Sequence, residues 1–272
     1  MCCISAETAC FLVVSMTMVS AAYHDLRSRE VPDVHWSVIS VVAGSMCIFR
    51  LDGPIHAILG ILSVSMMAVY MLSDRVSGPS AIPFLAAPVL IDSFLYIDGE
   101  GPWVLVVPVM YLLFLVLYHF GLLRGGADAK AMMSLSMAVP FYPWPGVLWE
   151  SGPVDGVLMN PPFVIFAMAL VLSLLSVVPA LCGSVSDGSV SVSRYRMSLD
   201  EAESSFVWPL EDVVDGCVRR IHPPDDPGPV YGRLRRYGCT DVEVTSMIPF
   251  IVPITVSYVM VMVLGNPLVM LV

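Results

Sequence analysis

The stretch "WVLVVPVMYLLFLVLYHFGLLRGGADAKAMMSLSMAV", residues 103–139, places a short charged segment between two apolar ones. The charged segment, 124–130, contains two consecutive glycines, an aspartate and the only lysine of the chain. About 20 mostly apolar residues are enough for a helix to cross the hydrocarbon core of a membrane. Asp128 therefore stands where one predicted span ends and another begins, and not in an ordinary soluble loop.

The composition of the whole chain agrees with this local pattern. Of its 272 residues, 57% are hydrophobic and 13% are charged, whereas about a quarter of the residues of a soluble domain are charged. We therefore expect an all-α integral membrane protein that is embedded in lipid. The formal net charge of −10 argues against nucleic acid as a partner, because phosphate binding needs clustered Lys and Arg. The seven cysteines show no metal-ligand spacing, so we expect neither a metal nor another cofactor.

The apolar segments predict a polytopic bundle of about eight transmembrane helices. The predicted spans are Ile4–Tyr23, Val34–Phe49, Pro54–Leu72, Pro79–Ile97, Pro102–Leu123, Ala129–Leu148, Pro161–Leu181 and Met247–Val269.

The distribution of basic residues predicts how these spans are oriented. Lys and Arg are enriched in the cytoplasmic loops of membrane proteins. With the N-terminus outside, twelve of the thirteen basic residues lie on the inner side and only Arg50 lies outside. The opposite orientation would reverse this asymmetry. We therefore expect a multi-pass protein of the plasma membrane with its N-terminus outside.

The long polar stretch near the C-terminus divides the chain. We predict a transmembrane bundle over residues 1–182, a small cytoplasmic segment over 183–246, and a final transmembrane helix in 247–272. Within the cytoplasmic segment, 183–205 has the composition of a linker, "WPLEDVVDGCVRRI" suggests a short amphipathic helix, and "TDVEVTSM" alternates like a strand. The acidic residues Glu211, Asp212 and Asp215 either attract a basic peptide or form a solvated surface.

A second aspartate gives Asp128 a candidate partner. Asp25 lies at the inner end of the first predicted span, and four predicted spans separate it from Asp128. An even number of crossings returns the chain to the same membrane face, so both carboxyl groups belong to the cytoplasmic rim of the bundle. Two carboxylates a few ångströms apart share one proton, since both cannot ionise without cost. The ionised one takes a proton from water and the protonated one polarises a peptide carbonyl.

The segments "DLRSREVPD", residues 25–33, and "GGADAK", residues 125–130, together resemble a known family. It consists of the GxGD-type aspartic peptidases that process type IV prepilins and archaeal preflagellins. The resemblance implies that Asp25 and Asp128 are the catalytic residues and that Gly125, Gly126, Ala127 and Lys130 support the motif. It also implies that the substrates are type IV pilin-like or archaellin precursors, whose leader peptides are cut at the cytoplasmic face.

Two features depart from the family pattern. The third motif position is Ala127 instead of glycine, a relaxation that resembles the archaeal branch. Four spans separate the aspartates, where the family usually has two. A six-span family core plus one extra hairpin, in or next to residues 74–123, would preserve the sidedness of the two motifs.

Other interpretations of the acidic residues remain open. Asp25 and Asp128 can each be a charged helix end, and His24, His35 and His119 on the inner side can serve packing or act as proton partners. Asp92 lies within a span near the outer side, with His56 as a candidate partner. An ionisable residue inside a span is a functional candidate by default, so the alternative function is a proton-coupled transporter that uses Asp92.

Overall fold

The computed structural model describes residues 5–73, 75–123, 125–144, 146–148, 159–186, 194–222, 224, 226–246 and 249–271. The chain forms two compact units. Unit 1 comprises the described residues of Met1–Leu172 and Phe250–Val272, and unit 2 comprises those of Ser173–Pro249. The two units are described separately below.

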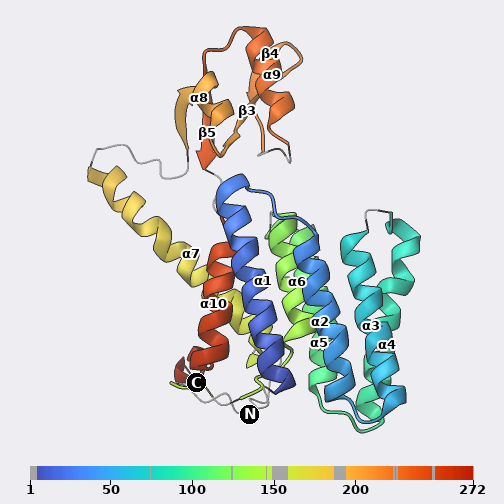
Figure 1. The fold of residues 1–272 in the computed structure, drawn as a ribbon. Helices are drawn as coiled ribbons and strands as arrows, with labels where there is room; N and C mark the ends of the chain where they lie inside the picture. The colour runs from blue at the N-terminus through green and yellow to red at the C-terminus, as the bar shows by residue number, and fades with distance from the viewer. Residues whose placement is uncertain are drawn as a thin grey trace. The chain divides into compact units, whose positions relative to one another are not determined.

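Unit 1 is helical, and its helices run up and down in an antiparallel arrangement (Figure 1). The α-helices that belong to it are α1 (Ala6–Ser28), α2 (Val34–Arg50), α3 (Pro54–Leu72), α4 (Ile82–Ile97), α5 (Trp103–His119), α6 (Gly126–Ala138), the part of α7 (Pro161–Ser186) up to Leu172, and α10 (Ile251–Leu264). Gly78–Ala81 and Pro267–Leu271 form short 3-10 helices.

Three helical segments of the described chain are long and apolar enough to cross a membrane: Ala6–Ser28, Pro54–Leu72 and Gly78–Ile97. Helices α2, α5 and α10 are also apolar, but they contain only 17, 17 and 14 residues. Large apolar side chains such as Met16, Val41, Ile58 and Leu90 are exposed on the outside of unit 1. Extended apolar surface of this kind is typical of a protein that contacts lipid.

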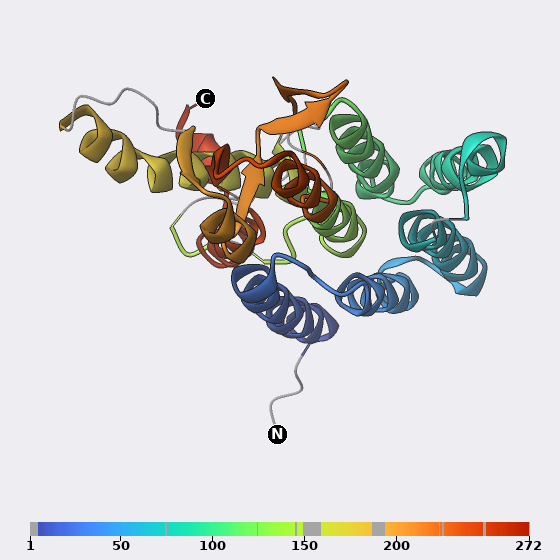
Figure 2. The same ribbon diagram turned by 90° about the horizontal axis from the view of Figure 1, so that it is seen from above.

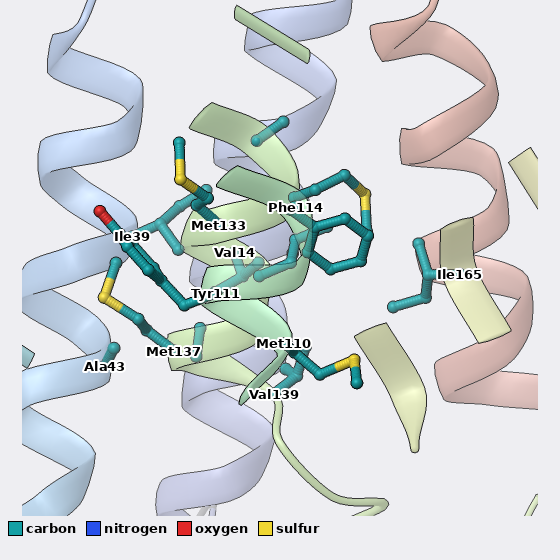
Figure 3. Packing of buried hydrophobic residues seen from close by; sticks show 14 of the residues in the cluster. Val14, Ile39, Ala43, Met110, Tyr111, Phe114, Met133, Met137, Val139 and Ile165 are labelled. Carbon is teal, nitrogen blue, oxygen red and sulfur yellow. The ribbon is translucent and has the colours of Figure 1, made fainter. Parts of the chain in front are cut away.

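Helix α6 lies at the centre of unit 1. It packs against α2, α3, α5 and α10, and every residue from Ala131 to Ala138 is buried. A helix that is buried on all sides needs small or apolar residues around its whole circumference, and "AMMSLSMA" supplies them. Figure 3 shows Met133 and Met137 of α6 among side chains from the neighbouring helices, including Ile39, Tyr111 and Phe114. The motif at the start of α6 is therefore held by a well-packed helix.

The predicted span Ala129–Leu148 is wrong in its second half. Helix α6 ends at Ala138 after 13 residues, because Pro140 and Pro143 follow and proline can neither donate a helical hydrogen bond nor fit the interior of a helix. The chain instead runs along the end of α10, where the Trp144 indole donates to the Met262 carbonyl at 2.7 Å. The final helix is also shorter than the predicted Met247–Val269.

Helices α3 and α4 form a hairpin at one edge of unit 1. They pack tightly against each other, and they lie at the same edge in Figure 1 and in the view from above in Figure 2. Without this hairpin, α1, α2, α5 and α6 would still run in alternating directions.

Unit 2 is a small α/β fold. Its strands are β1 (Tyr195–Ser198), β2 (Val207–Pro209), β3 (Glu211–Val214), β4 (Cys217–Arg220) and β5 (Asp241–Ser246), and its helices are α8 (Leu199–Ser204) and α9 (Gly228–Tyr237). Three antiparallel strands form a sheet in the order β1-β5-β2, and β3 pairs with β4. The side chains of Leu199, Tyr231, Leu234, Val242 and Val244 form its small core.

Two predictions for unit 2 are wrong and one is confirmed. The expected helix in "WPLEDVVDGCVRRI" is β2 followed by the hairpin β3-β4. Asp215 and Gly216 both have positive φ, 54° and 72°, as the Asp-Gly turn of a two-residue hairpin requires. The expected linker contains β1 and α8, although residues 187–193 of it lie outside the described residues. The strand expected in "TDVEVTSM" is β5.

Candidate active site

Asp25 lies in the last turn of α1 and is buried. The helix ends at Arg29, which adopts a left-handed conformation with φ of 59° and donates its backbone N–H to the Asp25 carbonyl at 3.1 Å. The Arg29 guanidinium also donates to this carbonyl, at 3.2 Å. Arg29, which belongs to the same motif as Asp25, thus caps the C-terminus of α1 and holds the backbone at Asp25 in place.

Asp128 lies in the first turn of α6, where a negative charge is favoured by the helix dipole. Its carboxyl group folds back over Gly125, the N-cap residue. A β-carbon at Gly125 would overlap this carboxyl group, whereas one at Gly126 would meet only the Tyr118 hydroxyl oxygen, at 3.9 Å. The two glycines of the motif therefore differ: Gly125 gives room to the carboxyl group, and Gly126 is exposed. Ala127, at the relaxed motif position, is half-buried.

The structure places the two aspartates of the sequence motifs at one end of unit 1. The end of α1 and the start of α6 lie at this end (Figure 1), and the charge of Asp25 acts on Asp128. A third segment joins them, because the backbone N–H of Ile251, the first residue of α10, donates to Asp25 Oδ2 at 3.2 Å. The N-termini of α6 and α10 and the C-terminus of α1 thus meet at the carboxyl pair.

Lys130 links the two motifs directly. Its Nζ lies 2.7 Å from Oδ1 of Asp33, the last residue of "DLRSREVPD". Asp33 is the N-cap residue of α2, but its side chain makes no capping hydrogen bond. This ion pair therefore joins the connection between α1 and α2 to the first turns of α6.

The histidines of the inner side have structural contacts. His35 is buried, with Nε2 3.0 Å from the Ser20 hydroxyl oxygen and Nδ1 3.0 Å from the Pro32 carbonyl oxygen. The His24 ring contacts the His35 ring edge to face, and His119 Nδ1 lies 3.0 Å from the Leu115 carbonyl oxygen. These contacts favour the packing interpretation of His35, which joins α1 to α2.

Asp92 is buried in α4 and does not pair with His56. Its carboxylate accepts a hydrogen bond from the Ser63 hydroxyl at 3.0 Å, and both residues line a small cavity together with Cys47 and Arg50. The predicted partner His56 instead lies 2.7 Å from Asp98 and 2.7 Å from Glu100. The prediction of an Asp92–His56 pair is therefore wrong, because His56 is bound by the connection that follows α4.

Arg50, the basic residue that breaks the charge asymmetry, is buried in interactions within unit 1. Its guanidinium donates to both carboxylate oxygens of Glu7, at 3.0 and 2.9 Å, and to the carbonyl of Ala138 at 3.1 Å. Cations near the C-terminus of a helix stabilise its free carbonyls. Arg50 therefore holds α1, α2 and the end of α6 together.

The acidic residues of unit 2 that were candidates for attracting a basic peptide are paired within the unit. Arg196 lies 2.8 Å from Glu211, Arg233 lies 2.7 Å from Asp212, and Arg219 lies 3.9 Å from Asp215. Each charge is balanced by an arginine, so the three carboxylates form ion pairs within the fold.

Two contacts of the site were not foreseen from the sequence. The first is the hydrogen bond from the Ile251 backbone N–H, which no side chain in the sequence indicates. The second is the ion pair of Asp33, a residue of the quoted motif to which the sequence analysis gave no role. Within the described residues, no group of three or more His, Cys, Asp and Glu side chains is arranged to hold a metal ion. Comparison of the chain with models of protein families and with curated proteins returned no match.

Proposed function

We propose that the chain is a membrane-embedded aspartic endopeptidase that cuts the leader peptide of type IV pilin-like or archaellin precursors at the cytoplasmic face. The observation that carries the proposal is the meeting of Asp25 and Asp128, from two motifs about a hundred residues apart, at one end of unit 1. One carboxylate would take a proton from water while the other, protonated, polarises the scissile carbonyl. Gly125 and the exposed Gly126 bring no side chain of their own to the approach to Asp128.

The proposal includes eight membrane crossings. Six of them, α1, α2, α5, α6, α7 and α10, would form the core of the prepilin and preflagellin peptidase family. The peripheral hairpin α3-α4 would be the extra pair of spans, and it leaves both aspartates on the same side. The short helices α5, α6 and α10 would cross together with the segments that follow them.

Co-expression with candidate precursors tests the proposal. A precursor that is processed becomes shorter, which a gel shift detects, and mass spectrometry of the product locates the cut. We expect Asp25→Asn and Asp128→Asn each to abolish cleavage while expression and membrane insertion stay normal, because either change removes one member of the carboxyl pair. Near-normal cleavage by either variant would exclude the pair as the catalytic site.

A proton-coupled transporter is the second candidate, and the buried Asp92 in its cavity favours it. The two functions predict opposite results for one pair of variants. For a peptidase, Asp92→Asn retains cleavage, because Asp92 is remote from the ends of α1 and α6 that carry the site. If Asp92→Asn abolishes function and Asp25→Asn does not, the transporter is the correct assignment.

A further inference from the structure

We propose that the two carboxyl groups have fixed and different roles: Asp25 is the ionised base that activates water, Asp128 carries the shared proton, and the N-terminus of α10 makes this distinction. The inference rests on the proposed peptidase function for its chemistry. The location of the proton itself can be measured without any cleavage.

Burial disfavours the charge of Asp25, and two contacts oppose this effect and favour its ionised form. Its Oδ2 accepts the backbone N–H of Ile251 at 3.2 Å, and a hydrogen bond to a charged acceptor is stronger than one to a neutral acceptor. Ile251 is the first residue of a 14-residue helix, so the positive end of the helix dipole also points at this carboxylate. The Arg29 guanidinium at the end of α1 adds a positive charge nearby.

Asp128 lacks a comparable donor among the described residues. It also lies in the first turn of a helix, and its carboxyl group folds over Gly125, a residue without a side chain. A hydrogen bond from an N–H to a carboxylate stabilises the charge more than the dipole alone does. When the two groups share one proton, it therefore resides on Asp128.

The other titratable groups around the pair do not reverse this order. Helix α10 contributes Tyr258, which lies two turns from Ile251 and has its hydroxyl 3.4 Å from the Phe11 carbonyl oxygen. Lys130 in α6 is engaged by Asp33, and His35 in α2 contacts Ser20 and Pro32. His24, next to Asp25 in α1, contacts the His35 ring.

These roles give a balanced hydrolysis step. The Asp25 carboxylate removes a proton from water as the water oxygen bonds to the scissile carbonyl carbon, and the Asp128 proton passes to the carbonyl oxygen. The resulting gem-diol then collapses: the C–N bond breaks, the amine nitrogen takes the proton from Asp25, and one hydroxyl returns a proton to Asp128. The products are a carboxylic acid and an amine, and the pair regains its starting protonation.

The first test removes the backbone donor. Ile251→Pro deletes the N–H, and proline is well suited to the first position of a helix. Loss of a hydrogen bond to a charged group makes the base harder to ionise, so the acid limb of the kcat/KM profile should move to higher pH by about one unit. Ile254→Val, which loses a buried methylene one turn later, is the control and should leave the limb in place. An unmoved limb in Ile251→Pro would overturn the inference.

Phe250, which would precede the new proline, has a helical conformation that a following proline disfavours, so Ile251→Pro can reduce the amount of folded protein. Less folded protein lowers the kcat/KM profile but does not move its acid limb.

A second test uses the unchanged protein and does not measure activity. Dicyclohexylcarbodiimide reacts with protonated carboxyl groups, and mass spectrometry can compare its adducts at the two sites in the full-length protein at neutral pH. We expect Asp128 to be labelled at least several-fold more than Asp25. Equal labelling, or preferential labelling of Asp25, would overturn the assignment even if the protein is a peptidase.

Discussion

At the scale of single residues, Gly125 determines where the Asp128 carboxyl group can lie. The atoms nearest to a β-carbon at this position would all belong to the Asp128 side chain, and the end of this side chain would overlap it. Gly125→Ala should therefore fold but force the carboxyl group to rotate away. Misplacing a catalytic group by about 1 Å can cost on the order of 100-fold in rate, so we expect kcat/KM for the precursor to fall by about 10- to 100-fold.

Gly126→Ala provides the matched comparison in the same motif. Its β-carbon would make an ordinary contact with the Tyr118 hydroxyl oxygen, 3.9 Å away, and the residue is exposed, so the thermal stability in detergent should match that of Gly125→Ala. If both alanine variants cleave the precursor equally well, the steric role of Gly125 is wrong.

The ion pair of Lys130 with Asp33 allows a test in which charge is exchanged. Both side chains are partly exposed, 24% and 52%, and exposed ion pairs contribute only about 0–1 kcal/mol. We expect Asp33→Lys or Lys130→Asp alone to lower kcat/KM by about two- to five-fold, a range set by this energy. The double variant, which restores the pair in reverse, should recover most of the loss in a double-mutant cycle. Additive losses would mean that the pair does not position the motifs.

Candidate site residues that stand in a sequence motif could be predicted, whereas a contact made by a backbone N–H could not. Asp25, Asp128, Gly125 and Lys130 stand in two short motifs, and the parity of the spans placed both motifs at one end. The donor from Ile251 depends on where α10 begins, and its side chain says nothing about hydrogen bonding. The sequence also did not reveal the partners of Arg50, because they lie in α1 and α6, far from Arg50 along the chain.

At the scale of elements, apolar segments predicted where helices exist better than where they end. The predicted and observed bounds agree at Pro54–Leu72, where Gly53 and Pro54 mark the start. They disagree after Ala138, since apolar residues continue although Pro140 and Pro143 prevent a helix. In unit 2, the Asp215-Gly216 turn was the signal for a hairpin, and the apolar spacing around it was misinterpreted as helical.

The ion pair of Asp212 with Arg233 makes a prediction about the stability of unit 2. The Arg233 guanidinium donates to both oxygens of Asp212, at 2.8 and 2.7 Å, and holds the pKa of this carboxyl group below its ordinary value. A carboxyl group with a lowered pKa stabilises the fold above its unfolded pKa of about 3.9, and the contribution is lost as the pH falls through the folded value. Asp212→Asn should therefore reduce the hydrogen-exchange protection of β3 and β4 at pH 7.

The same comparison at lower pH provides the control. At pH 5 the parent protein and Asp212→Asn should still differ, because both pH values lie above the ordinary carboxyl pKa of about 4. Below this value the difference should shrink, as the parent loses its own ion pair. A difference that stays constant down to pH 2 would show that the effect comes from packing and not from charge.

At the scale of the whole molecule, the distribution of basic residues predicts the membrane side of each segment. Residues 183–246 carry seven of the twelve arginines of the chain. Because Lys and Arg are enriched in cytoplasmic loops, we expect this segment to be cytoplasmic.

The native Cys217 allows a direct measurement of this expectation. Cys217 is an exposed free cysteine in unit 2. In a variant that keeps only this cysteine, a membrane-impermeant maleimide should label it in opened membranes but not in intact cells. The counterpart keeps only a cysteine introduced by Asp52→Cys, at an exposed position between α2 and α3 on the predicted outer side, and should be labelled in intact cells. Labelling of Cys217 in intact cells would contradict the predicted orientation, in which residues 183–246 and the leader peptide are both in the cytoplasm.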